Sequence, residues 1–95
     1  MKGRFIMKIV VTVVGKDRVG IIAKVTGILA EHSVNVLNLN QNILDGFFNM
    51  ILIANMEESK VSLREVQELL REEGKKIGVE IKAQNEEILN AMHTI

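Results

Sequence analysis

The sequence predicts an α+β fold in which one antiparallel sheet is covered by helices on a single face. Three observations predict this class: segments with the two-residue period of strands alternate with segments of helical period, the order along the chain is β-α-β-β-α-β, and an Asp-Gly pair separates the two consecutive strands. With 95 residues, of which 47% are hydrophobic and 25% charged, the chain is expected to form a single globular domain.

A strand followed by a helix is predicted over residues 7–32. Residues 7–14 are rich in β-branched side chains, which favours a strand with a buried face. Residues 18–32 are expected to form the first helix, because their apolar side chains recur along one stripe: Ile21, Ile22, Val25, Ile28 and Leu29. His32 is expected to hydrogen-bond to the last carbonyl groups of this helix.

Two strands joined by a tight turn are predicted over residues 35–54. The first, residues 35–44, alternates, and the face expected to meet the helices carries Leu37, Leu39 and Ile43. Its opposite face carries Asn38, Asn40 and Asn42. Asp45-Gly46 is typical of a two-residue hairpin turn, and the return strand, residues 47–54, is expected to bury Phe48, Met50 and Leu52.

A second helix and a last strand complete the predicted fold. The helix is expected from Leu63 to Lys76, because Ser62 and Glu65 match a capping box, and Gly78 is expected to end it. Residues 79–83 alternate as a strand, and residues 85–92 are expected to form a short C-terminal helix. Together these elements predict a ferredoxin-like βαββαβ sandwich, a four-stranded antiparallel sheet with two helices on one face plus the C-terminal helix.

Composition argues against several functions. Twelve basic and twelve acidic residues give a net charge of zero, which disfavours nucleic-acid and membrane partners. Without cysteine and with only two histidines, neither a metal site nor a cofactor is expected. No apolar run has the length of a signal peptide or membrane span, so a cytoplasmic location is expected. An RNA-recognition sheet is disfavoured because the only aromatic residues are Phe5, Phe47 and Phe48.

The most polar junction, Gly15 to Gly20, separates the first strand from the first helix. Its glycines have the outer spacing of a phosphate-binding P-loop, but Ile21 and Ile22 stand where that loop requires Lys and Ser or Thr. A structural interpretation is that Asp17 caps the helix, Gly15 permits a tight turn and Gly20 permits close packing.

A functional interpretation of the same junction is a small-ligand site. Amide groups at the start of a helix can hold a carboxylate, and the helix dipole favours its charge. The Asp17 carboxylate beside them suits an ammonium group. An α-amino acid carries both charges close together, so it fits this pairing, and the structural and functional interpretations both stay open.

The residues of this junction resemble those of the ACT domain family. The resemblance is carried by residues 17–23 (DRVGIIA), by Val25-Thr26 and Ile28-Leu29, and by residues 33–36 (SVNV). It covers most of the chain and is strongest to stand-alone members, which are similar to the ACT modules of the glycine cleavage system repressor and of formyltetrahydrofolate deformylase. An ACT-like domain is therefore expected at residues 7–84. Because a second methionine, Met7, stands at the start of the first strand, residues 1–6 are expected to be a short extension, and residues 85–95 a C-terminal helix or tail.

The resemblance implies a regulatory module that binds a small molecule, usually an amino acid, and is not an enzyme. It also implies a homodimer that acts as a metabolic sensor on a partner enzyme or regulator, with the ligand between the junction loop and the second strand. The expected ligand-binding positions are Gly15, Asp17, Arg18, Val19, Gly20, Ile21 and Asn35. Two interpretations of Asn38 and Asn40 stay open: they form a solvated face of an edge strand, or they line the ligand site where two subunits meet. Aspartate at position 17, where several relatives carry Asn, favours the ligand amine.

Two alternatives come from other classes of function. Acylphosphatase-type enzymes share the element order, and Arg18 and Asn38 would then hold a phosphate and position a water molecule. The rest of that family's loop motif is absent. A protein-interaction module without a ligand of its own is the other alternative, and it predicts a dimer that no metabolite stabilises.

Overall fold

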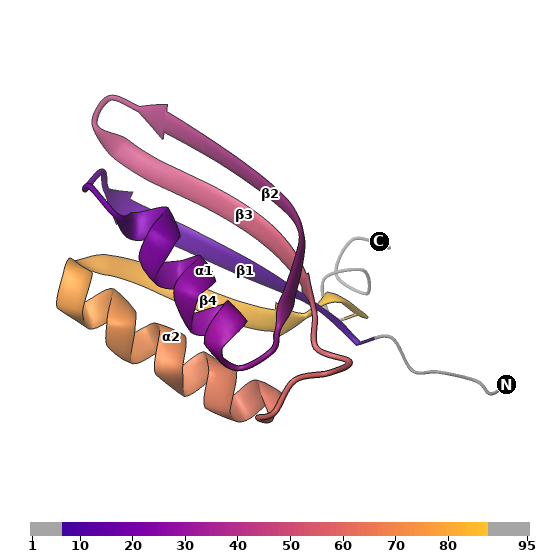
Figure 1. The fold of residues 1–95 in the computed structure, drawn as a ribbon. Helices are drawn as coiled ribbons and strands as arrows, with labels where there is room; N and C mark the ends of the chain where they lie inside the picture. Colours follow the sequence, from indigo (N-terminus) through magenta and orange to yellow (C-terminus); the bar gives the residue numbers. More distant parts are fainter. Residues whose placement is uncertain (1–6, 88–95) are drawn as a thin grey trace, which may run out of the picture.

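The computed structural model describes residues 7–87 and contains six elements. In chain order they are β1 (Lys8–Lys16), α1 (Ile21–Glu31), β2 (Asn35–Leu44), β3 (Phe47–Asn55), α2 (Leu63–Ile77) and β4 (Val79–Asn85). The strands form one antiparallel sheet in the order β2-β3-β1-β4, and both helices cover the same face of it (Figure 1). The predicted ferredoxin-like fold is confirmed. The predicted extension at residues 1–6 and most of the C-terminal helix lie outside the described residues.

The hydrophobic core lies between the sheet and the two helices. Ile9, Val11 and Val13 of β1 are all 0% exposed, because β1 is a central strand and they face the helices. The helices add one apolar stripe each, as their period predicts. The other side chains that are at most 3% exposed are Ile21, Val25, Leu29, Val34, Phe48, Met50, Leu52, Ala54, Val66, Leu70 and Ala83.

The β2–β3 hairpin has the predicted turn. Asp45 and Gly46 both have positive φ angles, 56° and 80°, as a tight two-residue turn requires. The prediction that Leu37 is buried is wrong, since 47% of it is exposed. A β-bulge between Val36 and Asn38 adds one residue to β2, so Val36 takes the position opposite the buried Ala54.

The first helix ends as the sequence predicts. The His32 ring nitrogen Nδ1 hydrogen-bonds to the carbonyl oxygen of Ile28 at 2.9 Å, so the predicted capping role of His32 is confirmed. The Val34 N–H donates to the Leu29 carbonyl at 2.8 Å and brings the chain back toward the sheet. The start of β2 is therefore fixed beside the C-terminal end of α1.

The second helix packs closely on β4. A Cβ atom added to Gly74 would lie 2.6 Å from the Val79 carbonyl oxygen, so only glycine allows this approach. The Gln67 amide nitrogen Nε2 donates to the Ala83 carbonyl at 2.7 Å and ties α2 to the same strand. None of the helices within residues 7–87 is long and apolar enough to cross a membrane.

The predicted capping box at the start of α2 is confirmed and is open to a direct test. The Glu65 N–H donates to the Ser62 hydroxyl at 3.1 Å, and the Ser62 N–H donates to the Glu65 carboxylate at 3.3 Å. Replacing Ser62 with alanine is expected to lower the free energy of unfolding by about 1 kcal/mol. Urea unfolding would measure this, with Ser62→Asp as the variant that should retain most of the stability. Equal stability of Ser62→Ala and the parent protein would contradict the prediction.

The two edges of the sheet differ in charge. The surface hollow between β4 and α2 is lined by four charged residues: Arg71, Lys75, Glu80 and Lys82. The hollow beside β2 carries charge only at Glu57 and Glu58. Because charged side chains on an edge strand oppose pairing with another strand, β2 is the edge better suited to pairing.

Candidate functional site

The loop between β1 and α1, residues 17–20, is fixed by two backbone hydrogen bonds. The Asp17 N–H donates to the Gly46 carbonyl at 2.9 Å, which fastens the loop to the turn of the hairpin. The Lys24 N–H donates to the carbonyl of Gly20, the N-cap residue of α1, at 2.9 Å. The prediction that Asp17 caps this helix is wrong, because α1 starts at Ile21 instead of residue 18 and no side chain caps it.

Glycine is required at positions 15 and 20 for reasons other than those predicted. Gly15 lies within β1, not in a turn, and an added Cβ would come within 2.7 Å of the Val79 side chain. Gly20 has a φ of 91°, which favours glycine, whereas nothing lies within 4 Å of an added Cβ. Gly15 therefore serves packing against β4, and Gly20 turns the chain into α1 without close packing.

The Arg18 side chain extends toward the turn between α2 and β4. Its Nη2 atom lies 3.6 Å from the position that a Cβ on Gly78 would occupy. Gly78 is the C-cap of α2, where the partial negative charge of the helix dipole favours a cation. Arg18 thus has a structural contact that its predicted role in ligand binding does not require.

A small hollow beside this loop, here called the loop hollow, has a volume of about 170 Å³. Gln41 lines it and is absent from the residues predicted from sequence. Gln41 pairs with the buried Met50, so it lies on the helix side of β2 between Leu39 and Ile43. A polar residue at a position where the alternation predicts an apolar one is the sequence signal that could have identified it. The loop hollow is lined by Asp17, Arg18, Gly20, Ile21, Ile22, Ala23, Gln41, Ile43 and Phe48.

The loop hollow offers groups of both charges. No side chain bonds to the amide groups at the start of α1, so these donors are available to a carboxylate. The Asp17 carboxylate forms no hydrogen bond or ion pair with any residue of the described chain. The Gln41 amide can donate to one ligand group and accept from another. The hollow can therefore hold a small zwitterion.

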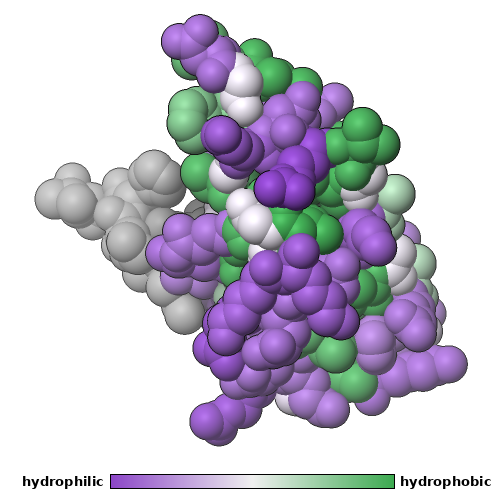
Figure 2. Space-filling view, turned by 90° about the vertical axis from the view of Figure 1, so that its left-hand side faces the viewer, coloured by the Kyte–Doolittle hydropathy of each residue, from purple (hydrophilic) through white to green (hydrophobic). Residues whose placement is uncertain are grey.

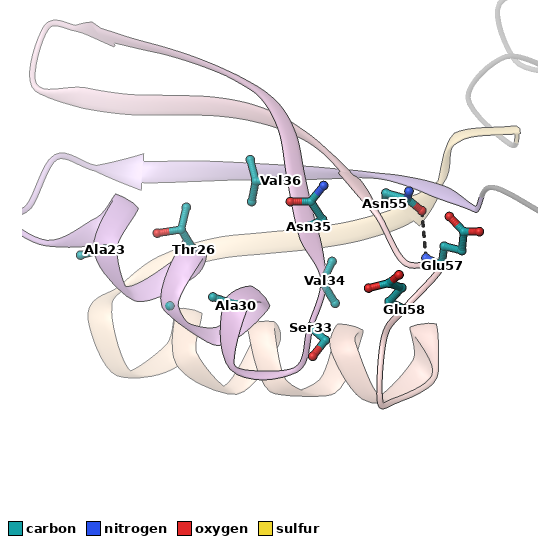
Figure 3. A pocket seen from close by; sticks show the side chains of 11 residues that line it. Ala23, Thr26, Ala30, Ser33, Val34, Asn35, Val36, Asn55, Glu57 and Glu58 are labelled. Carbon is teal, nitrogen blue, oxygen red and sulfur yellow. Dashed lines mark hydrogen bonds between the residues drawn. The ribbon is translucent and has the colours of Figure 1, made fainter.

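A larger groove of about 870 Å³ lies between α1 and β2 and is here called the α1–β2 groove (Figure 3). In Figure 3, β2 rises away from α1 toward the hairpin turn, and the groove opens between them. The helix gives it only short side chains, and Glu57 and Glu58 lie at the end nearest Asn35. Its lining consists of Ala23, Thr26, Gly27, Ala30, Ser33, Val34, Asn35, Val36, Asn55, Glu57 and Glu58.

Asp17 and Asn35, the two main predicted contacts, lie at opposite ends of α1. The helix has 11 residues, which corresponds to a length of about 16 Å. Asp17 precedes its first turn, whereas Asn35 opens β2 beside its last turn. One copy of the chain therefore does not bring these two side chains together.

Asn38 and Asn40 lie on the other face of the sheet. They pair with Ile53 and Ile51, which face away from the helices. Asn40 lines a separate, shallow hollow of about 570 Å³ on that face, together with Thr12 and Val14. Within one chain, neither amide joins the loop hollow.

The structure also argues against the acylphosphatase-type enzyme and the RNA-recognition sheet. Arg18 reaches the start of β4, whereas Asn38 stands on β2 at the opposite edge of the sheet, so they do not form one phosphate site. Phe48 is only 3% exposed and packs in the core, where it cannot stack on a base.

The sequence model of the ACT domain family matches residues 7–84. Among curated proteins, the chain is 49% identical over 86 residues to a UPF0237 protein from Neisseria meningitidis serogroup B, covering 90% of this chain and 96% of that protein. Among solved structures, it is similar to an ACT domain protein from Streptococcus pneumoniae, with 32% identity, a TM-score of 0.77, and coverage of 87% of this chain and 93% of the other.

Two more distant structures share the fold. A candidate glycine cleavage system transcriptional repressor has a TM-score of 0.75 at 18% identity, over 85% of this chain and 46% of its own. A formyltetrahydrofolate deformylase from Pseudomonas syringae pv. tomato has a TM-score of 0.78 at 19% identity, over 85% of this chain and 28% of its own. The likeness predicted from the junction residues is confirmed. The chain belongs to the ACT domain family of regulatory modules that bind small molecules.

Proposed function

We propose that the chain is a homodimeric metabolic sensor that binds an amino acid between the β1–α1 loop of one copy and the start of β2 of the other. The observation that carries this proposal is the separation of Asp17 from Asn35 along α1, with an open edge strand between them. A second copy supplies what one chain lacks. The proposed site contains Asp17, Gly20 and Gln41 of one copy and Asn35 of the other, and it does not include Asn38 or Asn40.

The chemistry of the loop hollow supports an amino acid as the ligand. The uncapped amide groups at the start of α1 favour a carboxylate, and the Asp17 carboxylate favours an ammonium group. The volume of about 170 Å³ lies below the range of roughly 300–1,000 Å³ that drug-sized ligands occupy. A small zwitterion with a short side chain matches both the charges and the size.

The geometry of β2 supports the dimer. Two copies of an edge strand can pair antiparallel about a two-fold axis, which extends the sheet and leaves the helices of both copies on one face. Because α1 and β2 run in opposite directions, this axis brings Asn35 of one copy to the hairpin end of the other, where the β1–α1 loop lies. Each dimer would then hold two equivalent sites.

A thermal-unfolding screen against the free amino acids tests the proposal. A ligand at 100 times its dissociation constant is expected to add about 2.7 kcal/mol of stability. For a domain of this size, that raises the midpoint by about 10–20 °C. The shift is expected to vanish in Asp17→Ala and in Asn35→Ala, and to persist in Asn38→Ala, which truncates an amide of the same strand on the other face.

The outcomes of this screen separate the remaining interpretations. Protein that has been unfolded and refolded first carries no bound ligand into the experiment. No response to any amino acid would reject the sensor and favour the ligand-free interaction module. A response that survives Asp17→Ala would place the ligand elsewhere.

A further inference from the structure

We infer that the α1–β2 groove of each copy receives Ile43 and Val19 of the other, so that two reciprocal insertions of apolar side chains fix the dimer. The inference rests on the proposed pairing of β2 strands. Backbone hydrogen bonds between two β2 strands permit several registers. The insertion of side chains into the groove is what would select one of them.

The α1–β2 groove is shaped and lined so that apolar side chains can fit into it. The face that α1 turns toward it is short throughout, consisting of Ala23, Thr26, Gly27 and Ala30. Val34 and Val36 form its floor next to β2 (Figure 3). The Thr26 hydroxyl is already bonded to the Ile22 carbonyl at 2.7 Å, so the side chain presents little unsatisfied polarity. These features suit aliphatic groups from outside the chain.

The side chains that would enter the groove are Ile43 and Val19. They lie at the hairpin end of the side of the molecule formed by α1 and β2, here called the α1–β2 flank. Ile43 faces the helix side of β2, opposite the buried Phe48, yet 51% of it is exposed because β2 has no outer neighbour. Val19 is 106% exposed in the β1–α1 loop. Figure 2 views this end of the molecule and shows hydrophobic residues exposed among hydrophilic ones in its upper half. Apolar side chains that gather on one part of a surface can mark an interaction site.

A two-fold axis near the middle of β2 brings the two features together. Antiparallel pairing centred on Asn40 sets Leu39 of one copy opposite Gln41 of the other and keeps each pair of side chains on one face. Because the bulge passes over Leu37, the next pair on the same face brings Ile43 of one copy beside Val36 of the other. Both side chains face the helices in their own copies, since Val36 pairs with Ala54 and Ile43 with Phe48. Ala30 lines the groove beside Val36. The β1–α1 loop, which carries Val19, is bonded to the hairpin turn at Gly46, so this pairing would bring it to the same end of the groove as Ile43. The axis repeats the contact at the other end of the flank.

The size and charge of the flank are those of a modest but specific interface. β2 has ten residues and is about 34 Å long, and the strand and helix together stand about 15 Å high, which gives about 500 Å² per copy. The total of about 1,000 Å² reaches the lower bound for a specific interface. Charged residues in the groove are limited to Glu57 and Glu58, at its end, as expected for a surface that becomes buried.

Sedimentation equilibrium on the full chain without added ligand tests the inference. Ala30→Leu fills the groove, and Val19→Asp puts a charge on the inserting side chain. Each is expected to raise the dimer dissociation constant about a hundredfold, because both copies of the contact are lost. Both positions are exposed in a single chain, so circular dichroism should show an unchanged fold. Glu72→Leu is the matched control, because it adds a leucine to the exposed side of α2 and should leave dimerisation unchanged.

A mixing experiment makes the test specific to the insertion. The double variant Val19→Ala/Ile43→Ala has small inserting side chains, and Ala30→Leu has a filled groove. In a heterodimer of the two, the filled groove meets the small side chains and the native groove meets the native ones. Native mass spectrometry is therefore expected to show the heterodimer in excess over both homodimers. Random mixing of the two variants would overturn the inference.

Failure of this inference can be told from failure of the proposed function. A wild-type dimer that is indifferent to Ala30→Leu and Val19→Asp would overturn the insertion and leave the β2 dimer standing. A wild-type chain that stays monomeric with and without amino acids would overturn both.

Discussion

Replacing Leu52 with alanine is expected to lower the free energy of unfolding by about 2–5 kcal/mol. Leu52 is 0% exposed and lies in β3, opposite Val11 of the central strand β1 and Leu39 of β2. Truncation leaves a cavity that the surrounding sheet cannot close, because strand pairing on both sides fixes the backbone. Urea unfolding monitored by circular dichroism would measure the change, and each kcal/mol corresponds to about 4–8 °C in the thermal midpoint.

The neighbouring residue provides the matched control. Ile51 belongs to the same strand and points to the opposite face, where 55% of it is exposed. Ile51→Ala is therefore expected to cost less than about 1 kcal/mol. Equal losses in the two variants would mean that the face of β3 assigned to the core is wrong.

The second large effect is expected from Gly74→Ala. The added Cβ would lie 2.6 Å from the Val79 carbonyl oxygen and 3.3 Å from the Ile81 side chain, so α2 must move away from β4. The loss of stability is expected to be about 1–3 kcal/mol, the usual range for overpacking a tight contact. Thermal unfolding would show it as a lower midpoint.

Gly27→Ala gives the opposite expectation from the same change of residue. Gly27 also lies inside a helix, but nothing lies within 4 Å of an added Cβ. Alanine has the higher helix propensity, so this variant is expected to gain roughly 0.5–1 kcal/mol. Because Gly27 also lines the α1–β2 groove, both variants are measured at a concentration at which the chain is monomeric. The two midpoints should then move in opposite directions, and a shift in the same direction would contradict the contacts assigned to Gly74 or to Gly27.

The elements whose signals are local could be predicted from the sequence. The capping box of α2 needs only Ser62 and Glu65, and the hairpin turn needs only Asp45 and Gly46, so both were predictable from a few adjacent residues. The core face of β3 followed from its alternation. These signals agree with one another, and that agreement determines the order of elements and hence the fold.

The features that depend on residues far apart in the chain could not be predicted. Aspartate and glycine are both common N-caps, so the sequence alone does not choose between Asp17 and Gly20. In the structure the Asp17 N–H is bonded to the Gly46 carbonyl in the β2–β3 turn, and Gly20 is the N-cap. The bulge that exposes Leu37 depends on pairing with β3. The small size of Gly15 is explained by Val79, which enters the fold only with the last strand.

The candidate site was predictable in its residue types and not in its arrangement. The sequence indicates that Asp17 and Asn35 carry polar groups suited to an amino acid. They lie before and after α1, so the length of this helix, about 16 Å, keeps them apart in one chain. Gln41 breaks the alternation of its strand, and a polar residue on a buried face is a signal that deserves more weight than the amides on the open face.

The unequal edges of the sheet also limit how far association can proceed. A chain with two receptive edges adds further copies at either end, as aggregating strands do. Here Arg71, Lys75, Glu80 and Lys82 place charges beside the β4 edge. A chain that pairs through its β2 edge therefore has no second edge that is suited to pairing. In the proposed dimer, association would therefore stop at the pair.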